Sequence, residues 1–297
     1  MISILIPTYN YNVTALFQAL KTELESIAPN YEVICYEDGS TEHVEDNSEI
    51  INTIVNAKHL ISKENKGRIT TRQSLAEIAT YDWLLFLDSD VIPEKKSFLH
   101  DYLKYVDFKY DAIYGGYDYD LAKPDMEFML RWKYGKNYEN VDAEIRNKTP
   151  YKIVISGNFL IKKSVFLDIN SRIKNDGYGY DNYLGALMKS SSTNVFHINN
   201  NVNHKGLDTN SVFLTKVEKA VETVFEINQK HSAIITENTL LEFYKRLKSL
   251  GLSKPIEFIF NLSKTKIRQH LLSSNPNLTL LQFYKLGYLC SITSSKK

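Results

Sequence analysis

Short apolar runs alternate with amphipathic stretches along the first 115 residues of the chain. Four runs are apolar or β-branched and end at turn residues or charges, as buried strands do; they cover residues 2–6, 32–36, 57–61 and 83–87. Between them, apolar positions recur at helical spacing over residues 13–27 and 70–79. Because nearly continuous apolar strands that alternate with helices are covered on both faces, the pattern predicts an α/β fold with a mainly parallel sheet flanked by helices.

The second half of the chain changes character near Asp208. Before it, further strands are expected at residues 112–114, 153–155 and 194–198. After it, strand signals stop and only helical patterns follow, at residues 212–228, 240–252, 256–262 and 280–289, with breaks expected at Gly251, Pro255 and Pro276. We therefore predict an α/β domain over residues 1–207 and an α-helical C-terminal region over residues 208–297.

Composition narrows the class of protein and its partners. With 43% hydrophobic and 12% aromatic residues, the chain of 297 residues has enough apolar side chains for a folded core. Its 36 Lys and Arg nearly balance 35 Asp and Glu, so the net charge of +1 gives no field to attract nucleic acid, which we exclude as a partner. Residues 232–297, however, hold ten of the basic and three of the acidic residues. The net charge near zero is therefore the sum of an acidic part, residues 1–231, and a basic tail, residues 232–297.

The cysteines and the N-terminal segment indicate the compartment. Cys35 and Cys290 are too few and too far apart for a disulfide framework or a thiolate zinc site, which suits a reducing compartment. The first apolar run stops at Pro7 and no basic residue precedes it, so we expect no signal peptide. No window approaches the about 18 uninterrupted apolar residues of a membrane-spanning helix. The sequence predicts a cytoplasmic protein.

Polar clusters follow each of the first four predicted strands. They are Pro7-Thr8-Tyr9-Asn10, Glu37-Asp38-Gly39-Ser40-Thr41, the segment 63–68, and Asp88-Ser89-Asp90. In parallel α/β sheets ligands bind at the carboxyl ends of the strands. The four clusters therefore predict one site.

Each cluster has a chemical interpretation and a plainer alternative. Asp88 and Asp90 could share a hard divalent cation, or could cap a following helix. Asp38 could accept the imide N–H of uracil or a ribose hydroxyl, or could form an Asx turn. Lys66, Arg68 and Arg72, near Gly67, could supply cations for phosphates, or could belong to a solvated loop and helix start.

Five motifs, in their order along the chain, resemble those of the family 2 glycosyltransferases of GT-A fold. They are Pro7-Thr8-Tyr9-Asn10, Asp38-Gly39-Ser40-Thr41, Asn65-x-Gly67 with Arg72, Asp88-x-Asp90 and Tyr180-Asp181. The resemblance covers about residues 1–206. It implies a Rossmann-like nucleotide-sugar-binding half over residues 1–115, and an acceptor-binding half with the catalytic base over residues 116–207. It also implies inverting transfer from a nucleotide-diphosphate sugar, with a UDP-sugar favoured, to a hydroxyl of a saccharide or lipid-linked acceptor, in surface polysaccharide synthesis.

The same resemblance assigns roles by position. The expected donor-binding residues are Pro7, Thr8, Tyr9, Asp38, Ser40, Lys66, Gly67, Arg72, Asp88, Ser89, Asp90 and Gly157. Mn2+ or Mg2+ would be bound by Asp90, with Asp88 and His204 as further ligands. Asp181 would be the general base. The family's Glu before this Asp is Tyr180 here, which puts acceptor binding in question.

Three other functions compete with this interpretation. A haloacid-dehalogenase-type phosphatase also uses Asp-x-Asp after an apolar strand, but expects it near the N-terminus and Thr or Val where Ile92 stands. A nucleotidyltransferase would carry a glycine-rich basic loop after the first strand, and a non-catalytic scaffold or binding protein could retain the fold.

The tail has two interpretations of its own. Its mixed apolar and basic helices could lie on the inner face of an anionic membrane, or could pack as a bundle on the catalytic domain or on a second subunit of a homo-oligomer.

Overall fold

A seven-stranded sheet forms the centre of the α/β part. The computed structural model describes residues 1–27, 30–106, 108–174, 177–230 and 238–295. Within these ranges the strand order of the large sheet is β3-β2-β1-β4-β8-β6-β9. Its strands are β1 (Ile2–Thr8), β2 (Tyr31–Asp38), β3 (Ala57–Ser62), β4 (Trp83–Leu87), β6 (Ala112–Tyr114), β8 (Asn158–Lys162) and β9 (Val195–His197).

The first four strands of this sheet run parallel, as the sequence predicts. β1 pairs in parallel with β2 and β4, and β2 pairs in parallel with β3. β8 runs antiparallel between β4 and β6. The carboxyl ends of β1, β2, β3 and β4 therefore lie along one edge, where the polar clusters follow.

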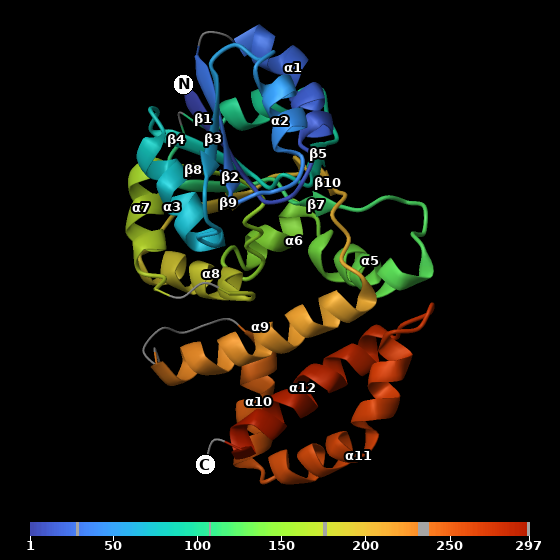
Figure 1. The fold of residues 1–297 in the computed structure, drawn as a ribbon. Helices are drawn as coiled ribbons and strands as arrows, with labels where there is room; N and C mark the ends of the chain where they lie inside the picture. The colour runs from blue at the N-terminus through green and yellow to red at the C-terminus, as the bar shows by residue number, and fades with distance from the viewer. Residues whose placement is uncertain (28–29, 107, 175–176, 231–237, 296–297) are drawn as a thin grey trace. The chain divides into compact units, whose positions relative to one another are not determined.

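Helices cover both faces of the large sheet (Figure 1). On one side, α1 (Thr14–Ile27) packs against α2 (Val44–Ile51) and α4 (Phe98–Leu103). On the other, α3 (Arg68–Ile78) packs against β1, β2 and α7 (Lys163–Ser171). The residues of β1, β2 and β4 are almost all buried, because both faces of these strands are covered.

A second, three-stranded sheet includes the segments that follow Asp90 and Asn201. Its order is β5-β10-β7, formed by β5 (Val91–Pro93), β10 (Val202–His204) and β7 (Tyr117–Asp118). β10 runs antiparallel to β5, with His204 opposite Val91. A short helix, α6 (Ala143–Lys148), packs against β9.

The chain divides into two compact units. Unit 1 comprises residues 1–119, 139–176 and 191–206, and unit 2 comprises residues 120–138, 177–190 and 207–297. Unit 2 holds η1 (Met126–Phe128), α5 (Met129–Tyr134), α8 (Tyr180–Ser190), α9 (Asn210–Lys230), α10 (Thr239–Ser249), α11 (Ser253–Leu271) and α12 (Leu278–Ser295). The π-helical turn η2 (Gly135–Glu139) follows α5. The boundary at residue 207 remains a prediction.

Unit 2 has a core of its own between its helices. Phe213 and Leu214 of α9 pack with Phe260 of α11 and with Tyr284 of α12. A Cβ at Gly287 of α12 would overlap the Phe260 ring, so this glycine permits the close contact of α11 and α12. None of the helices in the described ranges combines the length and the hydropathy of a membrane-spanning segment.

Two local predictions are wrong. The strand expected at residues 153–155 is absent, and the strand begins instead at Asn158, because the apolar run Phe159-Leu160-Ile161 is the one that fits between β4 and β6. The helix expected to begin after Pro255 begins at Ser253 and continues to Leu271. Proline is tolerated in the first turn of a helix, where its missing N–H would have no partner inside the helix.

Candidate active site

Asp88 follows β4 directly and is held by three side chains. Nη2 of Arg72, a buried residue of α3, donates to Oδ1 of Asp88, and Nη2 of Arg68 lies 3.7 Å from Oδ2. The hydroxyl of Tyr117 donates to Oδ2 at 3.2 Å. A Cβ at Gly157 would overlap both the Tyr117 hydroxyl and the Asp88 carboxylate, so a glycine is required at this position for the arrangement to exist.

The charges around Asp88 keep it ionised. Burial raises the pKa of this carboxyl group, but the Arg72 and Arg68 guanidinium groups outweigh burial, and the pKa lies below its usual value. The pKa of Tyr117 is raised well above its usual value, first by burial and then by the charges of Asp88 and Asp90. Tyr117 therefore stays protonated and donates its hydrogen bond.

Asp90 and His204 come together through the second sheet. The pairing of β5 and β10 places His204 opposite Val91, the residue after Asp90. Nε2 of His204 lies 3.3 Å from Oδ2 of Asp90. The backbone N–H of Lys205 donates to the carbonyl oxygen of Asp90 at 2.8 Å. A Cβ at Gly206 would overlap the Asp90 carboxylate. The segment His204-Lys205-Gly206 is thus shaped around Asp90.

The Asp90–His204 pair has the properties of two ligands of one divalent cation. Their nitrogen–oxygen distance of 3.3 Å is close to the about 3 Å between neighbouring ligands of an octahedral ion with bonds of about 2.1 Å. Nδ1 of His204 is buried and has no hydrogen-bond partner among the described residues, so no protein group holds the ring proton on Nε2, and the tautomer that carries it on Nδ1 leaves Nε2 as the ligand atom beside Asp90. The carboxylate suits Mn2+ or Mg2+, and the imidazole is a ligand for transition metals rather than for Mg2+. The residues present therefore fit a metal ion.

Asp38 joins the turn after β2 to the loop after β3. Its Oδ1 accepts the backbone N–H of Lys66 at 2.8 Å, and its Oδ2 accepts that of Gly67 at 2.9 Å. Gly39 adopts φ 73°, and a Cβ there would meet Asn65 N at 2.5 Å, so only glycine fits this turn. Each carboxylate oxygen can accept a further hydrogen bond. Asp38 can thus fix the loop and still contact a ligand.

Glu37, one residue earlier, links the loops that follow β1 and β2. Its Oε2 accepts from Ser40 at 2.5 Å and its Oε1 accepts from Asn47 at 2.8 Å. Ser40 Oγ in turn accepts the backbone N–H of Asn10 at 3.0 Å, and Asn47 accepts that of Val13 at 2.9 Å. A single buried carboxylate therefore sets the positions of both loops.

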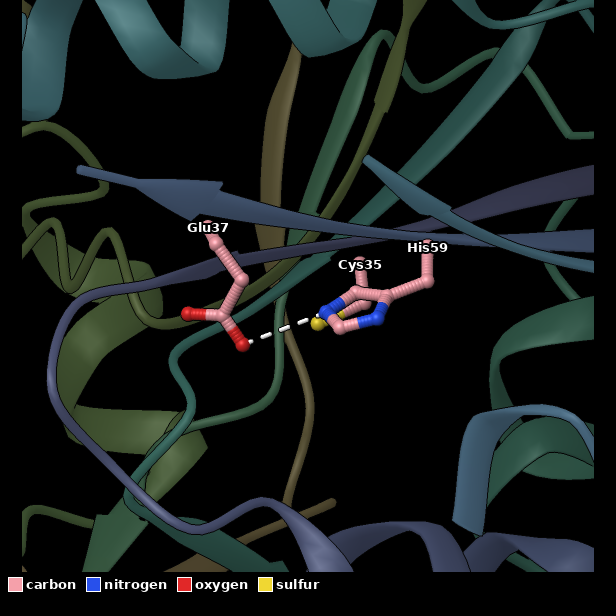
Figure 2. A group of neighbouring side chains, drawn as sticks. All are labelled: Cys35, Glu37 and His59. Carbon is pink, nitrogen blue, oxygen red and sulfur yellow. Dashed lines mark hydrogen bonds and ion pairs between the residues drawn. The ribbon is translucent and has the colours of Figure 1, made fainter. Parts of the chain in front are cut away.

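Figure 2 shows that Cys35, Glu37 and His59 point toward one another from β2 and β3. One ligand atom from each lies within 4.8 Å of the others, the composition of a metal site. Each group already has a protein partner, however. Cys35 Sγ lies 3.3 Å from Oγ1 of Thr8, and His59 Nε2 lies 3.3 Å from Glu37. Burial raises the pKa of the Cys35 thiol to about 12, so the group serves as a hydrogen-bonded part of the core.

The remaining predicted residues are spread over both units. Thr8 is buried, with its hydroxyl against Cys35, whereas Pro7 is half-buried and Tyr9 is exposed. Ser89 is half-buried between the two carboxylates. Asp181 lies in the first turn of α8, in unit 2, where the helix dipole favours a negative charge.

Arg68 and Glu37 belong to the predicted polar clusters and Tyr117 does not, and none of the three is among the residues to which the resemblance assigns a role. Arg68 and Tyr117 contact Asp88, and Glu37 fixes the two loops. Tyr117 could have been found, because it follows the predicted strand at residues 112–114 just as the other clusters follow theirs. The role of Glu37 depends on side chains from several segments, which no spacing in the sequence indicates.

Two solved structures share this architecture. The mannosyltransferase PcManGT of Pyrobaculum calidifontis, determined with GDP-Man and Mn2+, matches with a TM-score of 0.59 over 100% of this chain and 88% of its own, at 10% identity. TarS 1–349 of S. aureus, determined with UDP-GlcNAc, matches with a TM-score of 0.54 over 99% of this chain and 91% of its own, at 14% identity. The fold is therefore that of the GT-A class.

Sequence comparison identifies the family. Residues 3–169 match glycosyl transferase family 2, so the chain belongs to that family of glycosyltransferase enzymes. An uncharacterized glycosyltransferase of Mycoplasma genitalium is 26% identical over 208 residues. That match covers 66% of this chain and 66% of the relative, so the chain spans about two thirds of the relative's length.

Proposed function

We propose that this enzyme transfers a sugar from a nucleotide-diphosphate sugar to a hydroxyl of a saccharide or lipid-linked acceptor in surface polysaccharide synthesis. The observation that carries the proposal is the arrangement after β4. There, Asp88 is bound by Arg72 and Arg68, and two residues later Asp90 faces His204. Cations and a candidate metal pair thus lie beside each other, as a diphosphate requires.

The donor is a UDP-sugar in this proposal. The buried Asp38 carboxylate retains lone pairs that can accept the imide N–H of uracil, beside the loop that it fixes. In this proposal the nucleoside would be lined by Thr8 at the end of β1, by Tyr9 in the loop after it and by Ser40 in the loop after β2. PcManGT and TarS were determined with GDP-Man and UDP-GlcNAc, so a nucleotide-sugar is the shared chemistry of the two structures and a GDP-sugar is the alternative donor.

The diphosphate meets positive charge from α3 and the loop before it. The Arg68 side chain is 47% exposed, so it can contact a ligand while its guanidinium stays near Asp88. Lys66 is exposed on the same loop. Mn2+ or Mg2+, held by Asp90 and His204 with Asp88 as a further ligand, would neutralise the charge that develops on the leaving diphosphate.

Asp181 is the general base of the proposed reaction. Its carboxylate would take the proton of the acceptor hydroxyl while that oxygen attacks the anomeric carbon from the side opposite the diphosphate, with inversion. One carboxylate is sufficient for this step. Tyr180, at the position of the family's Glu, would alter acceptor recognition rather than proton transfer.

A screen of nucleotide-sugars tests the proposal. UDP- and GDP-sugars are added with and without Mn2+, and thermal stability and slow release of the nucleoside diphosphate are measured. A donor that binds only the native state raises the melting temperature. We expect stabilisation and hydrolysis with a UDP-sugar and metal. Stabilisation by GDP-sugars alone would show that the donor carries guanine instead of uracil. The absence of nucleotide binding with every metal would refute the proposal.

A further inference from the structure

Six large apolar side chains lie exposed on α10, on α11 and on the turn between them. They are Phe243, Leu250, Leu252, Phe258, Ile259 and Leu262, which we call the α10–α11 apolar surface. Their exposed fractions range from 43% to 72%. Single exposed apolar residues are ordinary, but six on adjoining elements of unit 2 make this segment a candidate interaction site.

The helical core of unit 2 does not account for these residues. α11 buries Phe260, Ile267 and Leu271 against α12, as Figure 1 shows for the two packed helices. Residues 256–262 nevertheless read Ile-Glu-Phe-Ile-Phe-Asn-Leu, apolar around most of the helix. Only one side is covered within the unit. A helix that is apolar beyond its packed face needs a second apolar environment.

Exposed basic side chains lie on the same segment as the α10–α11 apolar surface. The segment 239–271 holds seven Lys and Arg residues and two Glu residues. Lys245, Lys248, Lys254 and Lys266 are exposed, and none of them forms an ion pair with a carboxylate of the described residues. The surface is therefore apolar and positively charged at once, which is typical of helices that lie in the headgroup region of an anionic bilayer.

We propose that the α10–α11 apolar surface binds an anionic lipid membrane peripherally. A second copy of the chain fits less well, because a two-fold symmetric dimer would place the same basic surface against itself. Phe243, Phe258 and Leu262 would enter the boundary between headgroups and acyl chains, and the lysines would face lipid phosphates. This proposal is independent of the donor chemistry, since it concerns only residues of α10, of α11 and of the turn between them.

Vesicle flotation of the full chain tests it. One set of vesicles contains phosphatidylcholine and phosphatidylglycerol in equal parts, and the other contains phosphatidylcholine alone. We expect flotation with the anionic vesicles and much less with the neutral ones. The double variant Phe258→Ser with Leu262→Ser should lose about tenfold or more in membrane partitioning, and Lys254→Glu with Lys266→Glu should lose binding most strongly at low salt.

Matched control variants test whether the effect is specific to the α10–α11 apolar surface, or follows from any loss of an exposed apolar or basic residue. Val55→Ser removes an apolar residue that is 66% exposed in unit 1, and Lys21→Glu reverses an exposed charge there; both should float as the unchanged protein does. Circular dichroism checks that each variant is folded. Donor hydrolysis, measured in parallel, reports on the transferase proposal separately.

Three results would overturn the membrane proposal. The first is no flotation of the unchanged protein with anionic vesicles, and the second is equal flotation of the Phe258→Ser, Leu262→Ser variant. The third is a dimer, seen by light scattering, that this variant dissociates while no protein floats. In that case the surface would be an interface between two copies.

Discussion

His204 Nε2 lies 3.3 Å from Oδ2 of Asp90, although the two residues are far apart in the sequence. The antiparallel pairing of β10 with β5 brings them together, and Gly206 leaves the space that the carboxylate occupies. We expect His204→Ala to raise the metal concentration needed for half-maximal donor hydrolysis at least about tenfold. Metal titration of the hydrolysis rate measures this. His270→Ala, at an exposed position of α11, is the control and should change nothing.

Asp181→Asn tests the proposed base. Because the amide cannot accept the proton of the acceptor hydroxyl, kcat for transfer should fall about one hundred- to ten-thousand-fold. Donor affinity, measured by calorimetry, should stay nearly the same. Asp168→Asn on α7, exposed in an ion pair with Arg172, serves as the control. A parallel loss of donor affinity would make Asp181 a binding residue.

Arg72→Leu should destabilise the folded enzyme by about 2 kcal/mol or more, because it removes the main counter-charge of a largely buried carboxylate. The Asp88 side chain is 21% exposed to solvent, so we expect the loss of stability to be smaller than that of a fully buried, uncompensated charge. Urea unfolding measures the difference. Arg172→Leu breaks an exposed Arg–Asp pair and should cost less than about 1 kcal/mol. Equal losses would contradict the assigned role of Arg72.

Glu37→Gln should lower both stability and donor affinity. Ser40 and Asn47 both donate to Glu37, so an amide places an N–H against a donor and leaves a buried group unsatisfied, at about 1–3 kcal/mol. The Glu37 carboxylate fixes two loops, one of which contains Ser40 and begins next to Asp38. Because both residues belong to the proposed donor site, donor binding should weaken as well. Unfolding and nucleotide-sugar calorimetry are the measurements. Glu49→Gln, exposed on α2, should match the unchanged protein in both.

His197 should make stability depend on pH. Burial lowers its pKa to about 4, its Nε2–H donates to the carbonyl oxygen of Pro150, and Nδ1 faces the guanidinium of Arg146. As the pH falls from about 6.5 to about 4, the unfolded chain binds a proton that the folded ring does not, so this residue removes up to about 3 kcal/mol of stability. Unfolding at several pH values measures the slope. His197→Gln should flatten it, whereas His43→Gln, at an exposed histidine, should leave it unchanged.

The sequence by itself determined the α/β pattern, the parallel first half, the helical end of the chain and the polar clusters after the strands. These features follow from the spacing of apolar residues and from turn chemistry, which act over a few neighbouring residues. The wrong strand at residues 153–155 shows the limit. Two short apolar runs compete there, and only the space between β4 and β6 selects the one that begins at Asn158.

Only the tertiary structure decided how the clustered side chains are used. It turned Asp88 toward Arg72 and Tyr117, joined Asp38 to the loop after β3, and brought His204 to Asp90. Such contacts depend on strand pairing and side-chain packing between segments far apart in the chain, so no local pattern encodes them. It also left part of α11 uncovered, because how many faces of a helix are buried is set by its neighbours and not by its own residues.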